Sequence, residues 1–229
     1  MNLGELSDAV HKFSEDENVR CVAIAGKGKA FCAGQNLKEA LSFGEDEDDR
    51  AIQRFVIEYY NPLVLEIVKC RKPVIALVNG PAVGAGAMLA SICDFTLAVE
   101  SSYFSFAFAN IGLIPDTAGT YFLPKLVGKQ LASYLSLTGK KVPAPEAKKM
   151  GLVADVFPDS EFVEKSMEVL TQLAHSATTA LYLTKKAFNK SYDFTLKEQL
   201  DYESIIQQDA AETEDFRKKK KNCIKFMKL

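Results

Sequence analysis

The sequence predicts an α/β protein that becomes entirely helical after residue 157. Up to that point, short apolar runs rich in β-branched residues alternate with segments of helical periodicity. Beyond it only helical patterns follow, with no repeat or long linker to separate a second domain. A glycine-rich turn over residues 80–86 joins a buried strand to a helix of small apolar residues. We therefore expect one α/β core followed by a helical region.

Composition excludes several classes of protein. With 229 residues and 48% hydrophobic content, the chain can bury one sizeable core. A net charge of −2 gives no basic face, so we expect no nucleic-acid partner. The five cysteines are scattered and odd in number, and only two histidines occur, so we expect buried thiols, surface histidines and no metal. No apolar run spans a membrane and no signal peptide is evident, so we expect a cytoplasmic protein without a membrane partner.

The N-terminal part is expected to alternate helices and strands. Apolar residues at helical spacing predict a helix from Leu3 onward, and a strand follows at residues 21–25. A strand closing at Phe31 and Cys32 leads through a tight turn into a short helix. The acidic segment 45–50 is expected to be a solvated loop rather than a metal site. A long helix over residues 52–67 should be kinked by Pro62.

The most informative stretch runs from Lys72 to Asp94. It predicts a strand at residues 73–78, the glycine turn, and a helix from Ala87 to Ile92, which leaves backbone N–H groups exposed at the positive end of a helix. The glycines fit neither a phosphate loop nor a dinucleotide loop. One interpretation is a site for a small developing anion, such as a thioester enolate oxygen. The other is a turn that only lets the helix pack tightly on the sheet, and these residues leave both open.

The remaining elements follow in the same way. We expect a strand at 95–99, an aromatic extended segment at 101–108 that either lines a pocket or belongs to the core, and a loop at 110–120 with one carboxylate, Asp116. One more strand is predicted at residues 152–157. Further helices are predicted at residues 121–128, 129–137, 143–151, 162–174, 178–192 and 196–209. The predicted division is therefore an α/β core over residues 1–158 and a helical region over residues 159–229.

Five groups of residues, in this order, resemble motifs of the crotonase superfamily, the enoyl-CoA hydratases and isomerases. They are AFCAGQNLK at 30–38, KPVI at 72–75 with VNGPAVGAGA at 78–87, CD at 93–94, GLIPDTAGT at 112–120, and APEA at 144–147 with GLV at 151–153. The FCAGQ, YYNPLV, GAGA and GLIPD segments look most like the branch of isomerases that act on ring-epoxidised phenylacetyl-CoA in phenylacetate catabolism.

The resemblance implies a crotonase, ClpP-like spiral of β-β-α units with a C-terminal helical trimerisation region. It also implies an acyl-CoA thioester substrate, as in fatty acid metabolism, a homotrimer or dimer of trimers, and no cofactor beyond the coenzyme A carried by the substrate. Carried over by residue, the backbone N–H groups of Gln35 and Ala85 would form an oxyanion hole, and Asp116 would be the catalytic base. The implied substrate-binding and CoA-binding residues are Ala33, Asn36, Leu37, Gly84, Phe108 and Ile111.

Departures from the family pattern favour one reaction over another. A hydratase uses two glutamates, and the corresponding positions hold Met88 and a residue near Phe108, neither of which is an acid or a base. A single base, Asp116, suffices for isomerisation, although an aspartate here is also typical of a helix cap. We therefore expect an isomerase. The alternatives are another crotonase-fold enzyme, such as a weak hydratase or thioesterase, and a non-catalytic acyl-CoA-binding subunit.

Both ends of the chain differ from the family pattern. Related proteins begin with a β-hairpin before the first helix, whereas this chain starts at that helix. The chain ends in RKKKKNCIKFMKL from Arg217 rather than in an apolar-patterned helix. We expect a truncated or frame-altered version of the family sequence, the lysine run being otherwise a solvated tail or a contact to CoA phosphates.

Overall fold

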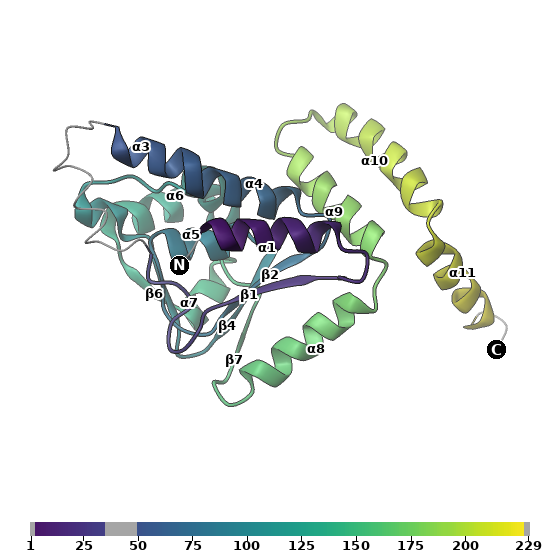
Figure 1. Ribbon diagram of the computed structural model, residues 1–229, viewed down its shortest axis with the longest axis horizontal. Coiled ribbons are helices and arrows are strands. Elements are labelled where there is room, and N and C mark those ends of the chain that lie inside the picture. The colour runs from purple at the N-terminus through teal and green to yellow at the C-terminus, as the bar shows by residue number, and fades with distance from the viewer. Residues whose placement is uncertain (1–2, 35–49, 227–229) are drawn as a thin grey trace.

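The computed structural model describes residues 3–34 and 50–226, with side chains described as far as Lys220. The chain forms an α/β body followed by a set of helices that projects from it (Figure 1). The strands are β1 (Val22–Ala25), β2 (Val74–Val78), β3 (Ala82–Val83), β4 (Phe95–Val99), β5 (Tyr103–Ser105), β6 (Lys141–Pro143) and β7 (Asp155–Phe157). The α-helices are α1 (Leu3–Glu15), α3 (Ala51–Phe55), α4 (Asn61–Lys69), α5 (Ala85–Ile92), α6 (Gly119–Thr138), α7 (Ala144–Lys149), α8 (Phe162–Ala174), α9 (Thr178–Lys190), α10 (Leu196–Ala211) and α11 (Glu214–Phe226).

Four parallel strands form the main sheet, in the order β1-β2-β4-β7. Val22 lies opposite Val74, and Ile75 lies opposite Phe95. Side chains alternate between the two faces, as the pleat requires. Val74 packs in the large core beneath α1, α4 and α5, whereas its neighbour Ile75 packs with Phe162 of α8 on the other face. Helices therefore cover both faces of the sheet at its centre, which explains why β2 is apolar throughout.

A smaller sheet, β3-β5-β6, lies beside the glycine turn. The strand expected to close at Phe31 and Cys32 is reduced to a single bridge between Cys32 and Ala82. The extended segment expected over 101–108 is also shorter: β5 ends at Ser105, and Ala107–Ile111 forms a 3-10 helix. Phe108 therefore lies on a helical turn, which directs it differently from a strand residue.

The long helix after residue 50 widens instead of breaking at Pro62. Its middle segment, Val56–Tyr60, is a π-helix, and the Asn61 N–H donates to the Val56 carbonyl five residues earlier. Proline has no N–H, and its ring collides with the carbonyl four residues before it in a regular α-helix. A wider turn relieves that collision, so the expected kink appears as a π-helical segment that ends at Tyr60.

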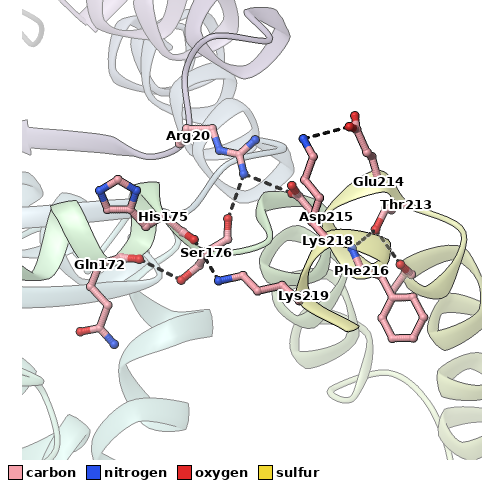
Figure 2. A network of polar contacts seen from close by, with 11 residues as sticks. Arg20, Gln172, His175, Ser176, Thr213, Glu214, Asp215, Phe216, Lys218 and Lys219 are labelled. Carbon is pink, nitrogen blue, oxygen red and sulfur yellow. Dashed lines mark hydrogen bonds and ion pairs between the residues drawn. The ribbon is translucent and has the colours of Figure 1, made fainter. Parts of the chain in front are cut away.

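The last three helices, α9, α10 and α11, form a projecting arm, and α9 and α10 share a small core of their own. Leu183, Ala187 and Ile206 are buried together where α9 packs on α10. The last described helix, α11, contains the lysine run, for which the sequence predicts an altered reading frame or, otherwise, a solvated tail or a contact to CoA phosphates. Arg20 holds it in place, because its Nη2 donates to the Ser176 carbonyl (2.9 Å) and to Asp215 Oδ2 of α11 (3.1 Å), as Figure 2 shows.

A buried ion pair attaches the arm to the body. Lys185 Nζ of α9 lies 3.0 Å from Asp94 Oδ2, with side chains only 7% and 23% exposed. Lys185 also donates to the Ile67 carbonyl at the end of α4, and Asp94 accepts from the Val74 N–H of β2. Burial raises the pKa of Asp94, an effect that the Lys185 ammonium partly offsets. One side chain of α9 is thus tied to a helix and to a strand of the body.

Candidate active site

A cavity of about 300 Å³ lies where the turn after Cys32, the π-helical segment, the start of α5 and the loop before α6 meet. Most of its lining is apolar, contributed by side chains such as Ile52, Phe55, Val83 and Leu113. A few polar groups converge on it, which is the usual composition of a small-molecule site. Among the described residues that line it, Asp116 is the only carboxylate.

The glycine turn places the first residue of α5, with its backbone N–H group, at the wall of this cavity. Gly84 has φ +55° and ψ −125°, a conformation that residues with a side chain rarely adopt. Its carbonyl accepts from the Met88 N–H (3.1 Å), which closes the first turn of the helix. Ala85 is the first residue of α5, so its N–H has no partner within the helix and lies at the positive end of the dipole. Both Gly84 and Ala85 line the cavity.

The other turn of the predicted oxyanion hole, at Ala33 and Gly34, lies directly against the glycine turn that precedes α5. A side chain on Gly34 would meet the Val83 carbonyl at 2.9 Å and the Ala85 nitrogen at 3.8 Å, so only glycine permits this approach. Ala33 and Gly34 both line the cavity. Gln35, Asn36 and Leu37 lie outside the described residues, so their predicted roles stay predictions.

Asp116 is half-buried in the wall of the cavity. Burial raises the pKa of its carboxyl group, and a hydrogen bond from Thr117 Oγ1 (2.9 Å) partly offsets that rise. The next two residues, Thr117 and Ala118, have φ values of +50° and +58°, which are uncommon for residues other than glycine. This strained connection leads into α6. Asp116 does not cap that helix with its side chain, because the residue at the N-cap is Ala118 and no side-chain cap bond is formed there.

Tyr60 is a second polar residue of the cavity, and sequence reasoning did not single it out. It is the last residue of the π-helical segment and is only 4% exposed. Burial raises the pKa of its phenol, and the nearby Asp116 carboxylate raises it further. The YYNPLV motif was visible in the sequence, but nothing local indicated which of the two tyrosines faces the cavity.

The residues at the two hydratase positions are placed differently. Met88 is fully buried and does not line the cavity, because its sulfur packs against Gly119 at the start of α6. Phe108 and Ile111 both line the cavity, as their predicted place in the substrate pocket requires. Of the other aromatic residues in this segment, Phe104 and Phe106 are buried in the core and do not line it.

Other features of the described residues offer less for catalysis. A larger cavity of about 390 Å³ lies against α9, but its charged groups, Asp94 and Lys185, are already paired with each other. No group of three potential metal ligands occurs within the described part of the chain. Among the same residues, none of the helices is both long and apolar enough to cross a membrane.

Together the spiral of strands and helices, the two adjoining glycine turns and the apolar cavity define an acyl-CoA enzyme of the crotonase type. The profile of the enoyl-CoA hydratase/isomerase family matches residues 2–227, and the chain belongs to that family.

Its relatives include both isomerases and hydratases. The chain is 37% identical over 216 residues to the 1,2-epoxyphenylacetyl-CoA isomerase of Escherichia coli, covering 93% of this chain and 81% of the relative. It is 36% identical over 213 residues to a "probable enoyl-CoA hydratase" of Rhodobacter capsulatus, covering 93% and 80%. The crystal structure of the enoyl-CoA hydratase of Bacillus anthracis superposes with a TM-score of 0.89 at 31% identity, covering 98% of this chain and 85% of that one.

Proposed function

We propose that the protein is an acyl-CoA isomerase that uses Asp116 as its single acid–base residue. The observation that carries this proposal is the composition of the cavity, where Asp116 is the only carboxylate among the described lining residues. Water addition needs a second group to activate and orient the water, and the two positions that supply it in hydratases hold Met88 and a residue near Phe108. Isomerisation needs only one group that takes a proton and returns it.

The reaction begins with the thioester oxygen bound at the start of α5. The Ala85 N–H, together with that of Gln35, stabilises the negative charge that develops on this oxygen when the adjacent carbon loses a proton. The Asp116 carboxylate takes that proton and becomes a carboxylic acid. It then returns the proton to a carbon two positions further along on the same face, so the double bond moves and no atom is gained or lost.

The environment of Asp116 supports this role. A general base works best when its pKa approaches the working pH. Burial raises the pKa of Asp116 toward that range, while the hydrogen bond from Thr117 keeps the carboxylate form accessible. The surrounding apolar wall also excludes water that would compete for the enolate.

The choice of acyl group is proposed from the relatives. Similarity to the 1,2-epoxyphenylacetyl-CoA isomerase of Escherichia coli supports a ring-derived acyl group and a role in phenylacetate catabolism. A hydratase name among the relatives keeps water addition as the second candidate. We further propose a homotrimer or dimer of trimers, a cytoplasmic location, and no cofactor other than the coenzyme A of the substrate.

Asp116→Asn tests the proposed base. The amide keeps the shape of the side chain and can still accept the hydrogen bond from Thr117, but it cannot take a proton. Turnover of a 3-enoyl-CoA should fall by about 10²–10⁴-fold, while the Kd for the CoA ester stays near its wild-type value. Asp8→Asn, on the exposed side of α1, is the matched control and should leave both quantities unchanged.

Three outcomes would count against the proposal. Full activity of Asp116→Asn on every enoyl-CoA isomer would remove the single-base mechanism, whereas binding of the CoA ester without turnover by the wild-type protein would favour a non-catalytic acyl-CoA-binding subunit. Hydration of a 2-enoyl-CoA by the wild-type protein at a rate exceeding isomerisation would favour the hydratase.

A further inference from the structure

Met88 lies between the two parts of the candidate active site. It is fully buried in α5 and does not line the cavity. Its N–H donates to the Gly84 carbonyl (3.1 Å), so it completes the helical turn that begins with Ala85. Its side chain packs against the first residue of α6, Gly119, three positions after Asp116. One residue therefore connects the turn that presents the Ala85 N–H group to the loop that carries the carboxylate.

The contact between Met88 and this loop leaves no free space. A side chain on Gly119 would collide with the Met88 sulfur, and it would also meet Pro115 Cβ at 3.1 Å and Met88 Cγ at 3.2 Å. Only glycine permits so close an approach. Pro115 directly precedes Asp116, and Gly119 ends the loop. The methionine side chain and the two ends of the loop therefore meet at one point.

The loop does not hold its shape through the preferences of its own residues. Thr117 and Ala118 have φ values of +50° and +58°, a region that residues with a side chain occupy only where the surroundings enforce it. The Gly119 N–H closes the loop by donating to the Asp116 carbonyl (2.7 Å). Because Met88 fills the space behind Gly119, it opposes relaxation of this strained turn, which would displace Asp116.

We propose that Met88 is a positioning residue, whose side chain fixes the loop that carries Asp116 relative to the Ala85 N–H group. This inference rests on the proposed function and adds a residue to its machinery. The base and the oxyanion donor act on the same substrate, so their relative placement sets the rate. A displacement of about 1 Å between such groups can cost about 10²-fold.

Met88→Ala removes the contact and leaves the cavity lining unchanged. The kcat for a 3-enoyl-CoA should fall by about 10²-fold, while the Kd of the CoA ester stays the same because Met88 does not line the cavity. Met88→Leu keeps a similar volume and should restore kcat to near the wild-type value. Ile92→Ala is the matched control, because Ile92 is a buried residue at the other end of α5 and lines the cavity beside α9. It should leave kcat unchanged.

A second measurement does not depend on turnover. Burial raises the pKa of Asp116, so a loop that relaxes toward water should let this pKa fall. Tyr60, the other titratable side chain among the described residues of the cavity wall, stays protonated because its own pKa is raised. The NMR titration of the Asp116 carboxyl carbon should therefore move to lower pH in Met88→Ala and stay in place in Met88→Leu and Ile92→Ala.

A milder variant keeps the test available if Met88→Ala does not fold, which thermal unfolding shows. Met88→Val removes less of the side chain. It should change kcat and the Asp116 titration in the same direction as Met88→Ala, by a smaller amount.

Each outcome has one consequence. An unchanged Asp116 titration in the folded truncation variant overturns the inference, whatever kcat does. An equal loss of kcat in Ile92→Ala overturns it as well, because the loss would then reflect a general loosening of α5, and so does a Met88→Leu variant as slow as Met88→Ala. A titration that moves while kcat stays at the wild-type value supports the contact and contradicts the proposed function instead, since Asp116 would then not be the base.

Discussion

At the scale of single residues, two opposing effects set the behaviour of Asp116. Burial raises its pKa, and the hydroxyl of Thr117 lowers it. Tyr60 does not compete as a base, because burial and the same carboxylate raise its pKa above the ordinary value of a phenol. The pH dependence of kcat/KM should therefore show one acidic limb, rising as Asp116 loses its proton, and no second limb from Tyr60 near neutral pH.

Thr117→Val tests this balance. Valine has the same shape and branches at the same carbon, but it cannot donate the hydrogen bond that stabilises the carboxylate. The pKa of Asp116 should rise further, so the acidic limb should move to higher pH while the plateau rate remains near the wild-type value. Initial rates on a 3-enoyl-CoA, measured from pH 4 to pH 9, give the position of the acidic limb for the variant and the wild-type protein. A limb that stays in place or moves to lower pH would contradict its assignment to Asp116.

At the scale of elements, the attachment of α9 to the α/β body depends on a buried ion pair as well as on apolar packing. Lys185 reaches from α9 to Asp94 and to the Ile67 carbonyl, so a single side chain joins the arm to a helix and to the end of a strand. The net contribution of such a buried pair is small because both charges are taken out of water. Removing one partner is costly, since the other charge remains buried.

Lys185→Met should therefore lower the free energy of unfolding by about 3 kcal/mol, the lower end for a broken buried pair because Asp94 keeps some contact with water. The double variant with Asp94→Asn should recover part of that loss, because no uncompensated charge remains. Urea unfolding measures both. Lys197→Met breaks an exposed ion pair of α10 and should change stability by less than about 0.5 kcal/mol. A loss for Lys185→Met no larger than this control would show that the pair does not hold α9.

At the scale of the whole molecule, α9 and α10 expose several large apolar side chains. Leu183 and Ile206 are buried between α9 and α10, and Leu170 and Leu173 of α8 pack on the sheet. Several large apolar side chains on the arm are nevertheless exposed, namely Phe188, Leu196, Leu200 and Ile205. Exposed large apolar side chains gathered on two neighbouring helices are typical of an interface.

We therefore predict that the protein associates through the arm into trimers or hexamers. Light scattering at micromolar concentration should give three or six times the mass of the chain, and Leu196→Glu with Ile205→Glu should shift the distribution toward smaller species because a charge would be buried in the interface. A monodisperse wild-type monomer would contradict the prediction.

Arg20 links the two ends of the described chain. It precedes β1, yet its side chain binds the turn between α8 and α9 and the start of α11, while Lys219 donates to the His175 carbonyl beside it (Figure 2). These contacts tie α11 to Arg20 and to the turn between α8 and α9. The sequence pattern predicts no helix beyond residue 209, and the described lysine side chains of α11, at residues 218–220, are exposed.

The sequence by itself determined the four strands of the main sheet, the two glycine turns and the single carboxylate of the loop before α6. These features are local: a β-branched run, a glycine at positive φ and an aspartate between Pro115 and Thr117 are each recognisable within a few residues. The residues Ala33, Gly34, Gly84, Ala85, Phe108, Ile111 and Asp116 all prove to line one cavity. The acyl-CoA roles assigned to them remain predictions.

Only the tertiary structure decided the rest. The place of Tyr60 depends on one extra residue in a helical turn and on a loop 56 residues away, and the pairing of Lys185 with Asp94 joins positions 91 apart. Met88 occupies a position where the family pattern has a catalytic group, yet its packing against Gly119 takes it out of the cavity. A sequence pattern reports which side chains prefer burial. Which of them meet is decided by contacts between distant segments, because these arise only when the whole core packs.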